Sequence, residues 1–330
     1  MIKSTLWLVS LVIWTSLMLP LPLSNAAVSS SVPLTTAVTS SPNAAASTAP
    51  SASTNVPVPV PAPAPVQPDN SLSSPSLMDA IKQWIQSISV KPGYEAWKQA
   101  TWTSQPLGPG THGWIVLLQS DGKPVGYMVI HAADPNNPTK YRLTEYGNGN
   151  TPLFSMQTLY QSLVQLELMD TSYQAERLYT SPLQAVWKVT SGEHLYYIDG
   201  KTGEILPPLA TDSGMQELDK PNEEQLFSLL KPEHTITASI LLPEFDPYER
   251  LPWVKGTPLQ YESTSALLKD LELQRKLTYT AQLYRNKVTV PMAVTGYHQW
   301  SNNEVFLLLE QAGQRAIPYD TAFKLGKLYP

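Results

Sequence analysis

The segment 185–206 decides how the middle of this chain folds, and it reads AVWKVTSGEHLYYIDGKTGEIL. Apolar and polar residues alternate on both sides of Ser191-Gly192, which is typical of two strands joined by a tight turn. A second tight turn is predicted from Asp199 to Gly203, in which the Asp199 carboxylate accepts backbone N–H groups and Gly203 supplies a positive φ. We therefore expect an antiparallel meander.

A helix is predicted just before this meander. An apolar stripe recurs at helical spacing after Ser155, and the polar run from Asp170 to Ser172 ends it. The stripe consists of Met156, Leu159, Tyr160, Leu163 and Leu166. A meander that packs on such a helix makes an α+β unit, which we place at residues 153–206.

The runs Ala185 to Val189 and Tyr196 to Leu206 resemble the PepSY family, which typically ends in an apolar or aromatic pair, an Asp, a short turn and Thr-Gly-Glu. The resemblance is carried by Trp187 to Leu206 and extends back to Leu153. It implies a small α+β module found in propeptides of secreted peptidases and in envelope proteins, where it is associated with peptidase inhibition or other protein contacts. It implies no enzymatic activity.

Upstream, residues 76–206 as a whole are expected to form one α+β region. Ser76 with Asp79 resembles a capping box, followed by apolar residues at helical spacing through Ile88. Strands are predicted at 112–119, 125–131 and 141–146. The first of these is apolar on both faces, so we expect it inside its sheet, with helices packed on small antiparallel sheets overall.

Downstream, residues 207–258 are rich in proline and are expected to form a long connection, with a short helix from Asn222 through Leu230. Residues 259–330 predict a second small α+β or barrel-like domain. Its elements are a helix at 264–276 and strands at 277–285, 287–294 and 305–310.

The run Val290 to His298, with Phe306 to Leu309 after it, resembles the second half of papain-like peptidases of bacterial secretion systems. In those enzymes a strand that carries the catalytic His runs into a Gly-Tyr turn. This chain has no cysteine, and Pro291 or Met292 stands where that His is expected. The resemblance therefore implies a non-catalytic relative.

The N-terminal part of the chain predicts export. Residues 1–26 combine an apolar run with the small-residue step Ser24-Asn25-Ala26, which is typical of a cleaved signal peptide; the alternative is an uncleaved membrane anchor that faces outside. Residues 27–75 are rich in Pro, Ala and Ser with Asp69 as their only charge, which predicts a disordered linker. A cysteine-free exported chain is typical of a bacterial cell envelope.

No motif marks a catalytic, cofactor-binding or metal site, so we assign none. The five histidines never occur at the spacings that bring two imidazoles onto one metal. Ser228 to Lys231 and Lys201 to Gly203 match two motifs of penicillin-recognising enzymes, but in reversed order. The net charge of −5 lacks any basic block, which argues against nucleic acid as a partner.

We therefore expect a secreted or cell-surface, non-enzymatic binding protein that contacts or restrains an extracellular peptidase or an envelope protein. The alternatives are a wall-polysaccharide-binding protein and an unrecognised extracellular hydrolase, and a membrane is expected as a partner only if the leader is uncleaved. Aromatic rings offer large, rigid contact surfaces, although half-buried sheets also favour Tyr and Trp. The candidate contact residues are Trp187, Tyr197, Trp253, Tyr297 and Trp300.

Overall fold

The computed structural model describes residues 75–108, 111–134, 140–207 and 228–330. The predicted signal peptide and, apart from Pro75, the predicted linker lie outside these ranges, as does most of the helix expected from Asn222. Among the residues in these ranges, no helix is both long and apolar enough to cross a bilayer.

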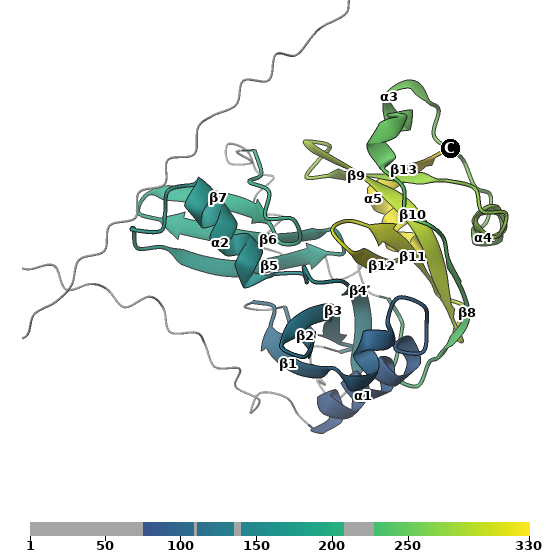
Figure 1. Cartoon of the computed structure of the whole chain (residues 1–330), viewed down its shortest axis with the longest axis horizontal. Coiled ribbons are helices and arrows are strands. Elements are labelled where there is room, and N and C mark those ends of the chain that lie inside the picture. Colours follow the sequence, from purple (N-terminus) through teal and green to yellow (C-terminus); the bar gives the residue numbers. More distant parts are fainter. Residues whose placement is uncertain (1–74, 109–110, 135–139, 208–227) are drawn as a thin grey trace, which may run out of the picture. The chain divides into compact units, whose positions relative to one another are not determined.

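Ten strands form one sheet, called the large sheet here, in the order β1-β2-β3-β4-β12-β11-β10-β9-β13, with β8 pairing with β10 (Figure 1). Its strands are β1 (Thr101–Pro106), β2 (Gly113–Ser120), β3 (Lys123–Ala132), β4 (Tyr141–Asn148), β8 (Ile236–Leu241), β9 (Thr278–Leu283), β10 (Val288–Trp300), β11 (Val305–Glu310), β12 (Gln314–Pro318) and β13 (Gly326–Tyr329). The small sheet consists of β5 (Gln174–Ser181), β6 (Gln184–Ser191) and β7 (His194–Asp199).

The helices are short and connect or flank these strands. They are α1 (Pro75–Ile88), η2 (Glu95–Gln99), α2 (Met156–Gln165), η3 (Pro247–Glu249), α3 (Pro252–Lys255), α4 (Thr264–Glu272) and α5 (Tyr319–Leu325). The chain is thus α+β with antiparallel pairing, as predicted. Helix α1 begins one residue before Ser76, so Ser76 lies in the first turn and does not cap the helix.

The large sheet crosses the expected domain boundaries. Strand β4 pairs with β12 through Gly147 opposite Arg315 and Tyr146 opposite Ala316, so strands of the 76–206 region and of the 259–330 region belong to one sheet. The segment expected to be only a connection contributes β8, which pairs with the second half of β10. The boundaries predicted at 206 and 258 therefore separate segments that share one sheet.

Strand β2 lies between β1 and β3, which confirms its predicted place inside a sheet. Side chains alternate along a strand, so the two faces of β2 enter two different cores. Val116 and Leu118 pack in a core with Ile81 and Trp84 of α1. Ile115 packs in a second core that also holds residues of α2 and the small sheet.

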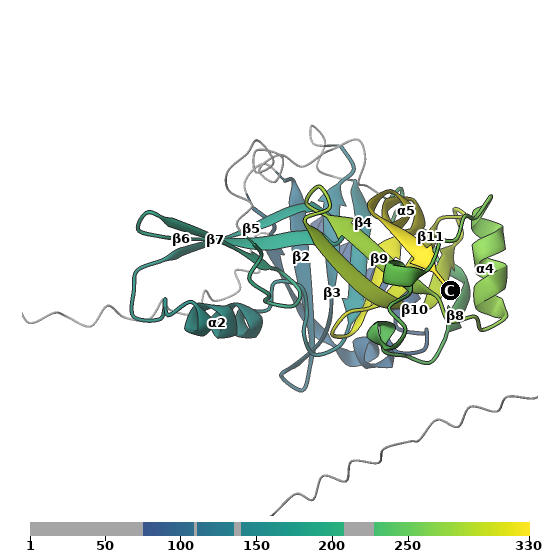
Figure 2. The ribbon, with the colours of Figure 1, turned by 90° about the horizontal axis from the view of Figure 1, so that it is seen from above.

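The small sheet confirms the predicted meander and its packing on a helix. Trp187 of β6 lies opposite Ile198 of β7, and both belong to the core that includes Leu159 and Leu163 of α2. Figure 2 shows α2 running alongside this sheet.

Candidate functional site

A pocket in the described part of the chain lies beside α1. Apolar residues at helical spacing bury one face of this helix: Leu77, Ile81, Trp84 and Ile88 are all at most 1% exposed. The polar residues between them are left on the outer face, where they form one wall of a groove.

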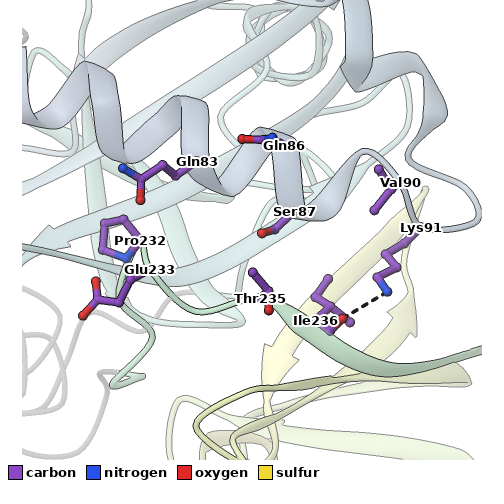
Figure 3. A pocket seen from close by; sticks show the side chains of 9 residues that line it. All are labelled: Gln83, Gln86, Ser87, Val90, Lys91, Pro232, Glu233, Thr235 and Ile236. Carbon is purple, nitrogen blue, oxygen red and sulfur yellow. Dashed lines mark hydrogen bonds between the residues drawn. The ribbon is translucent and has the colours of Figure 1, made fainter.

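This groove has a volume of about 470 Å³ and runs between α1 and the segment 232–236 that leads into β8 (Figure 3). We call it the α1–β8 groove. Six of its nine lining residues are polar or charged, and they include amide and hydroxyl side chains. The lining residues are Gln83, Gln86, Ser87, Val90, Lys91, Pro232, Glu233, Thr235 and Ile236.

The second wall of the groove is held from both sides. Trp84 of α1 donates its indole N–H to the carbonyl of Lys231 at 3.3 Å. On the other side, the backbone N–H of Ser301 donates to the carbonyl of Thr235 at 2.9 Å. Contacts with the helix and with the sheet therefore fix this wall, and fixed walls are typical of pre-formed binding sites.

The strand edge beside the groove is unpaired within the described sheet, because β8 pairs with β10 alone. The carbonyl of Ile236, at the start of β8, instead accepts a hydrogen bond from Lys91 Nζ at 3.1 Å (Figure 3). An extended segment that adds to a sheet edge uses such backbone groups.

The groove carries opposite charges at its two ends. Figure 3 shows Lys91 beside Val90 and Ile236 at one end, and Glu233 beside Pro232 and Gln83 at the other. Lys91 is half-buried and Glu233 is exposed. Glu233 lies 4.0 Å from Lys231 Nζ in an ion pair whose side chains are both more than half exposed, so this pair contributes little.

The buried charges of the protein lie elsewhere, around Glu145 of β4. Arg315 of β12 donates to Glu145 Oε1 through Nε at 2.9 Å and through Nη2 at 2.7 Å. The Tyr127 hydroxyl donates to Oε1 at 2.5 Å and the Tyr179 hydroxyl to Oε2 at 2.9 Å. Burial, and then the Glu145 carboxylate, raises the pKa of both tyrosines. This cluster ties β3, β4, β5 and β12 together.

A second buried charge, Lys201, sits in the turn after β7. As predicted, Asp199 Oδ1 accepts the backbone N–H of Lys201 at 2.8 Å and that of Thr202 at 2.7 Å, and Gly203 has a φ of +76°. The Lys201 ammonium donates to the carbonyls of Thr151 and Ala312. Burial, and then the positive charge of Arg315, lowers the pKa of Lys201 to about 7.

Two histidines are buried in the large sheet. His131 Nδ1 lies 2.8 Å from the Thr144 hydroxyl, and His298 Nδ1 lies 2.7 Å from the Tyr146 hydroxyl. Burial lowers the pKa of each to about 3, so both are neutral at physiological pH. Among the described residues, no group of three or more His, Asp or Glu side chains is arranged to hold a metal ion.

The structure does not bring the five candidate contact residues together. Trp187, Tyr197, Tyr297 and Trp300 are at most 6% exposed, because they lie in strands whose faces are covered. They belong to three different cores, and only Tyr197 and Tyr297 share one. Trp253 in α3 is the only one of the five that is partly exposed. These five residues therefore do not form an aromatic contact surface.

The sequence alone does not identify the residues that line the groove. Gln83, Gln86 and Ser87 fall between the apolar positions of α1, so the amphipathic pattern places them outward without showing what faces them. Thr235 and Ile236 lie in the segment interpreted as a connection, and only the β8–β10 pairing places them opposite α1.

A smaller pocket of about 200 Å³ lies by α5 and β13 and is mainly apolar, with Tyr261, Tyr319 and Phe323 in its lining. The positions Pro291 and Met292, where the papain-like resemblance would require a histidine, are buried in β10.

No protein-family model matches this chain, and no curated protein matches its sequence.

Proposed function

We propose that this chain is a secreted or cell-surface protein that works by binding, and that it recognises an extended segment of a partner protein in the α1–β8 groove. The observation that carries the proposal is the position of this groove between α1 and the start of β8, whose outer edge has no partner strand among the residues that the structure describes. Grooves of this kind take up extended peptides as an added strand, with backbone hydrogen bonds for affinity and neighbouring side chains for selectivity.

The lining of the groove suits a polar segment. Gln83 and Gln86 offer amide groups that both donate and accept hydrogen bonds, and Ser87 and Thr235 offer hydroxyl groups. These amide and hydroxyl groups also suit a saccharide, which favours wall polysaccharide as the second candidate ligand. The strand edge supports the peptide over the saccharide, because only a peptide provides a matching row of backbone N–H and C=O groups.

The PepSY-like resemblance supports a protein as the partner, and an extracellular peptidase as one class of partner. The helix of that module, α2, carries an uncharged outer face on which Met156, Tyr160 and Val164 follow each other at i, i+4 and i+8 and are 49 to 62% exposed. Exposed apolar side chains in a row are typical of surfaces that contact proteins. The predicted leader and linker support a location outside the cell.

The test is a pull-down with the tagged chain from culture fluid and from washed envelope of the producing organism, with bound species identified by mass. A Ser87→Tyr variant fills the groove, and an Asp79→Tyr variant places the same side chain at an exposed site on α1 that does not line the groove. We expect a protein that is lost with Ser87→Tyr and retained with Asp79→Tyr. Retention on walls without a protein would favour the saccharide, and equal capture by both variants would refute the groove as the site.

A further inference from the structure

We propose that the α1–β8 groove selects a segment that presents a carboxylate to Lys91, either an acidic side chain or a free C-terminus. This inference rests on the proposed function and adds the chemical class of the ligand. It predicts that the bound segment has a fixed direction, because Glu233 at the other end, whose ion pair with Lys231 is exposed and weak, favours a cationic group there.

The Lys91 ammonium group has unused capacity to bind a negative charge. This group has three donors, and within the described part of the chain it donates to the carbonyl of Ile236 alone. None of the described carboxylates lies within ion-pair distance of it. Lys91 is therefore a half-buried cation in a groove, paired only with a neutral acceptor.

Two structural roles also favour a cation at this position. Lys91 lies just after the C-terminal end of α1, where the helix dipole attracts positive charge, and lysine commonly protects an exposed strand edge. Neither role provides a negative charge, so both leave the ammonium available to a ligand. The contact with Ile236 instead suggests an exchange of partners.

In this exchange, an added segment donates a backbone N–H to the Ile236 carbonyl, the group that Lys91 occupies in the free protein. The ammonium is then released to the carboxylate of the same segment. A charge-assisted hydrogen bond is stronger than one to a neutral carbonyl, so the exchange favours ligands that carry a carboxylate.

The test uses two display libraries of random eight-residue segments, one with blocked ends and one with a free C-terminus, selected on the full chain. Only segments that lose binding to Ser87→Tyr are counted, which restricts the readout to the groove. We expect enrichment of Asp or Glu in the first library, or of free-terminus binders in the second, which identifies the source of the carboxylate.

The decisive variant is Lys91→Gln, whose amide keeps a donor for Ile236 but removes the charge. We expect it to weaken the selected segments about tenfold. The matched control is Lys98→Gln, at an exposed lysine that does not line this groove and should leave binding unchanged. Groove-dependent segments without a carboxylate preference, or with one that survives Lys91→Gln, would overturn this inference and leave the proposed function standing. A selection that yields no groove-dependent segment would overturn both.

Discussion

Replacing Glu145 by Leu should destabilise the protein more than any substitution of a surface charge. Glu145 is 0% exposed and Arg315 is 1% exposed, so the substitution leaves a buried guanidinium that has lost its hydrogen-bonded carboxylate and keeps the hydrogen bond from Nη1 to Gln311. The carboxylate also accepts the hydroxyl groups of Tyr127 and Tyr179, which lose their acceptor. Breaking a buried ion pair from one side costs about 3–5 kcal/mol.

Urea unfolding followed by tryptophan fluorescence measures this loss. Arg275→Gln serves as the comparison, because its partner Asp270 is also a carboxylate but the Arg275 side chain is 61% exposed, and its loss should cost about 0–1 kcal/mol. The double variant Glu145→Leu/Arg315→Met should recover much of the stability, since a buried pair is often replaceable by apolar residues. A loss below about 1 kcal/mol for Glu145→Leu, with an unchanged urea dependence, would refute this account of the cluster.

Three further predictions concern pH and the backbone. The pKa of Lys201 falls from 10.5 to about 7 on folding, so the unfolded chain binds more protons than the folded protein between these two pH values. The free energy of unfolding should therefore rise with pH across that window. In Lys201→Met this rise should be smaller, which chemical denaturation at several pH values will measure. The pKa values of His131 and His298 fall from 6.5 to about 3 on folding, so their contribution to the free energy of unfolding is present above about pH 6.5 and is lost as the pH falls toward 3. His298→Gln should reduce the slope of the free energy of unfolding against pH in this acid range. An unchanged slope would contradict the burial of a neutral imidazole. Gly296→Ala should cost more than about 3 kcal/mol because its Cβ would lie 1.9 Å from the Ile240 carbonyl, whereas Gly122→Ala, also at positive φ but with open space around it, should cost about 1–2 kcal/mol in thermal or urea unfolding.

Local patterns in the sequence were sufficient for elements that bury one continuous face. The stripe through Leu159 and Leu163 predicts α2, and the alternation around Trp187 predicts β6, because these patterns reflect the 3.6-residue and two-residue periods of helix and strand. Pairings between distant segments leave no such mark. Arg315 is polar, yet it lies in a fully buried strand because Glu145, 170 residues earlier, is on the neighbouring strand.

The same limit explains why the contact residues predicted from the sequence differ from the residues that line the groove. The sequence predicts Trp300 as a surface contact because it does not show which strands lie beside β10. In the structure, β8 and β11 lie on either side of β10 and the indole is buried. Ile236 lies between prolines at 232 and 243, which favoured a connection over a strand. The groove exists only because that strand pairs with β10.

The pairing of β4 with β12 determines when the large sheet can form during synthesis. During synthesis, β1 to β4 emerge well before β12, and until β12 arrives the edge of β4 has no partner strand. Contacts between such distant residues form slowly, and an open strand edge promotes aggregation in the meantime. Correct folding of β1 to β4 therefore depends on how soon β12 is synthesised and pairs with β4.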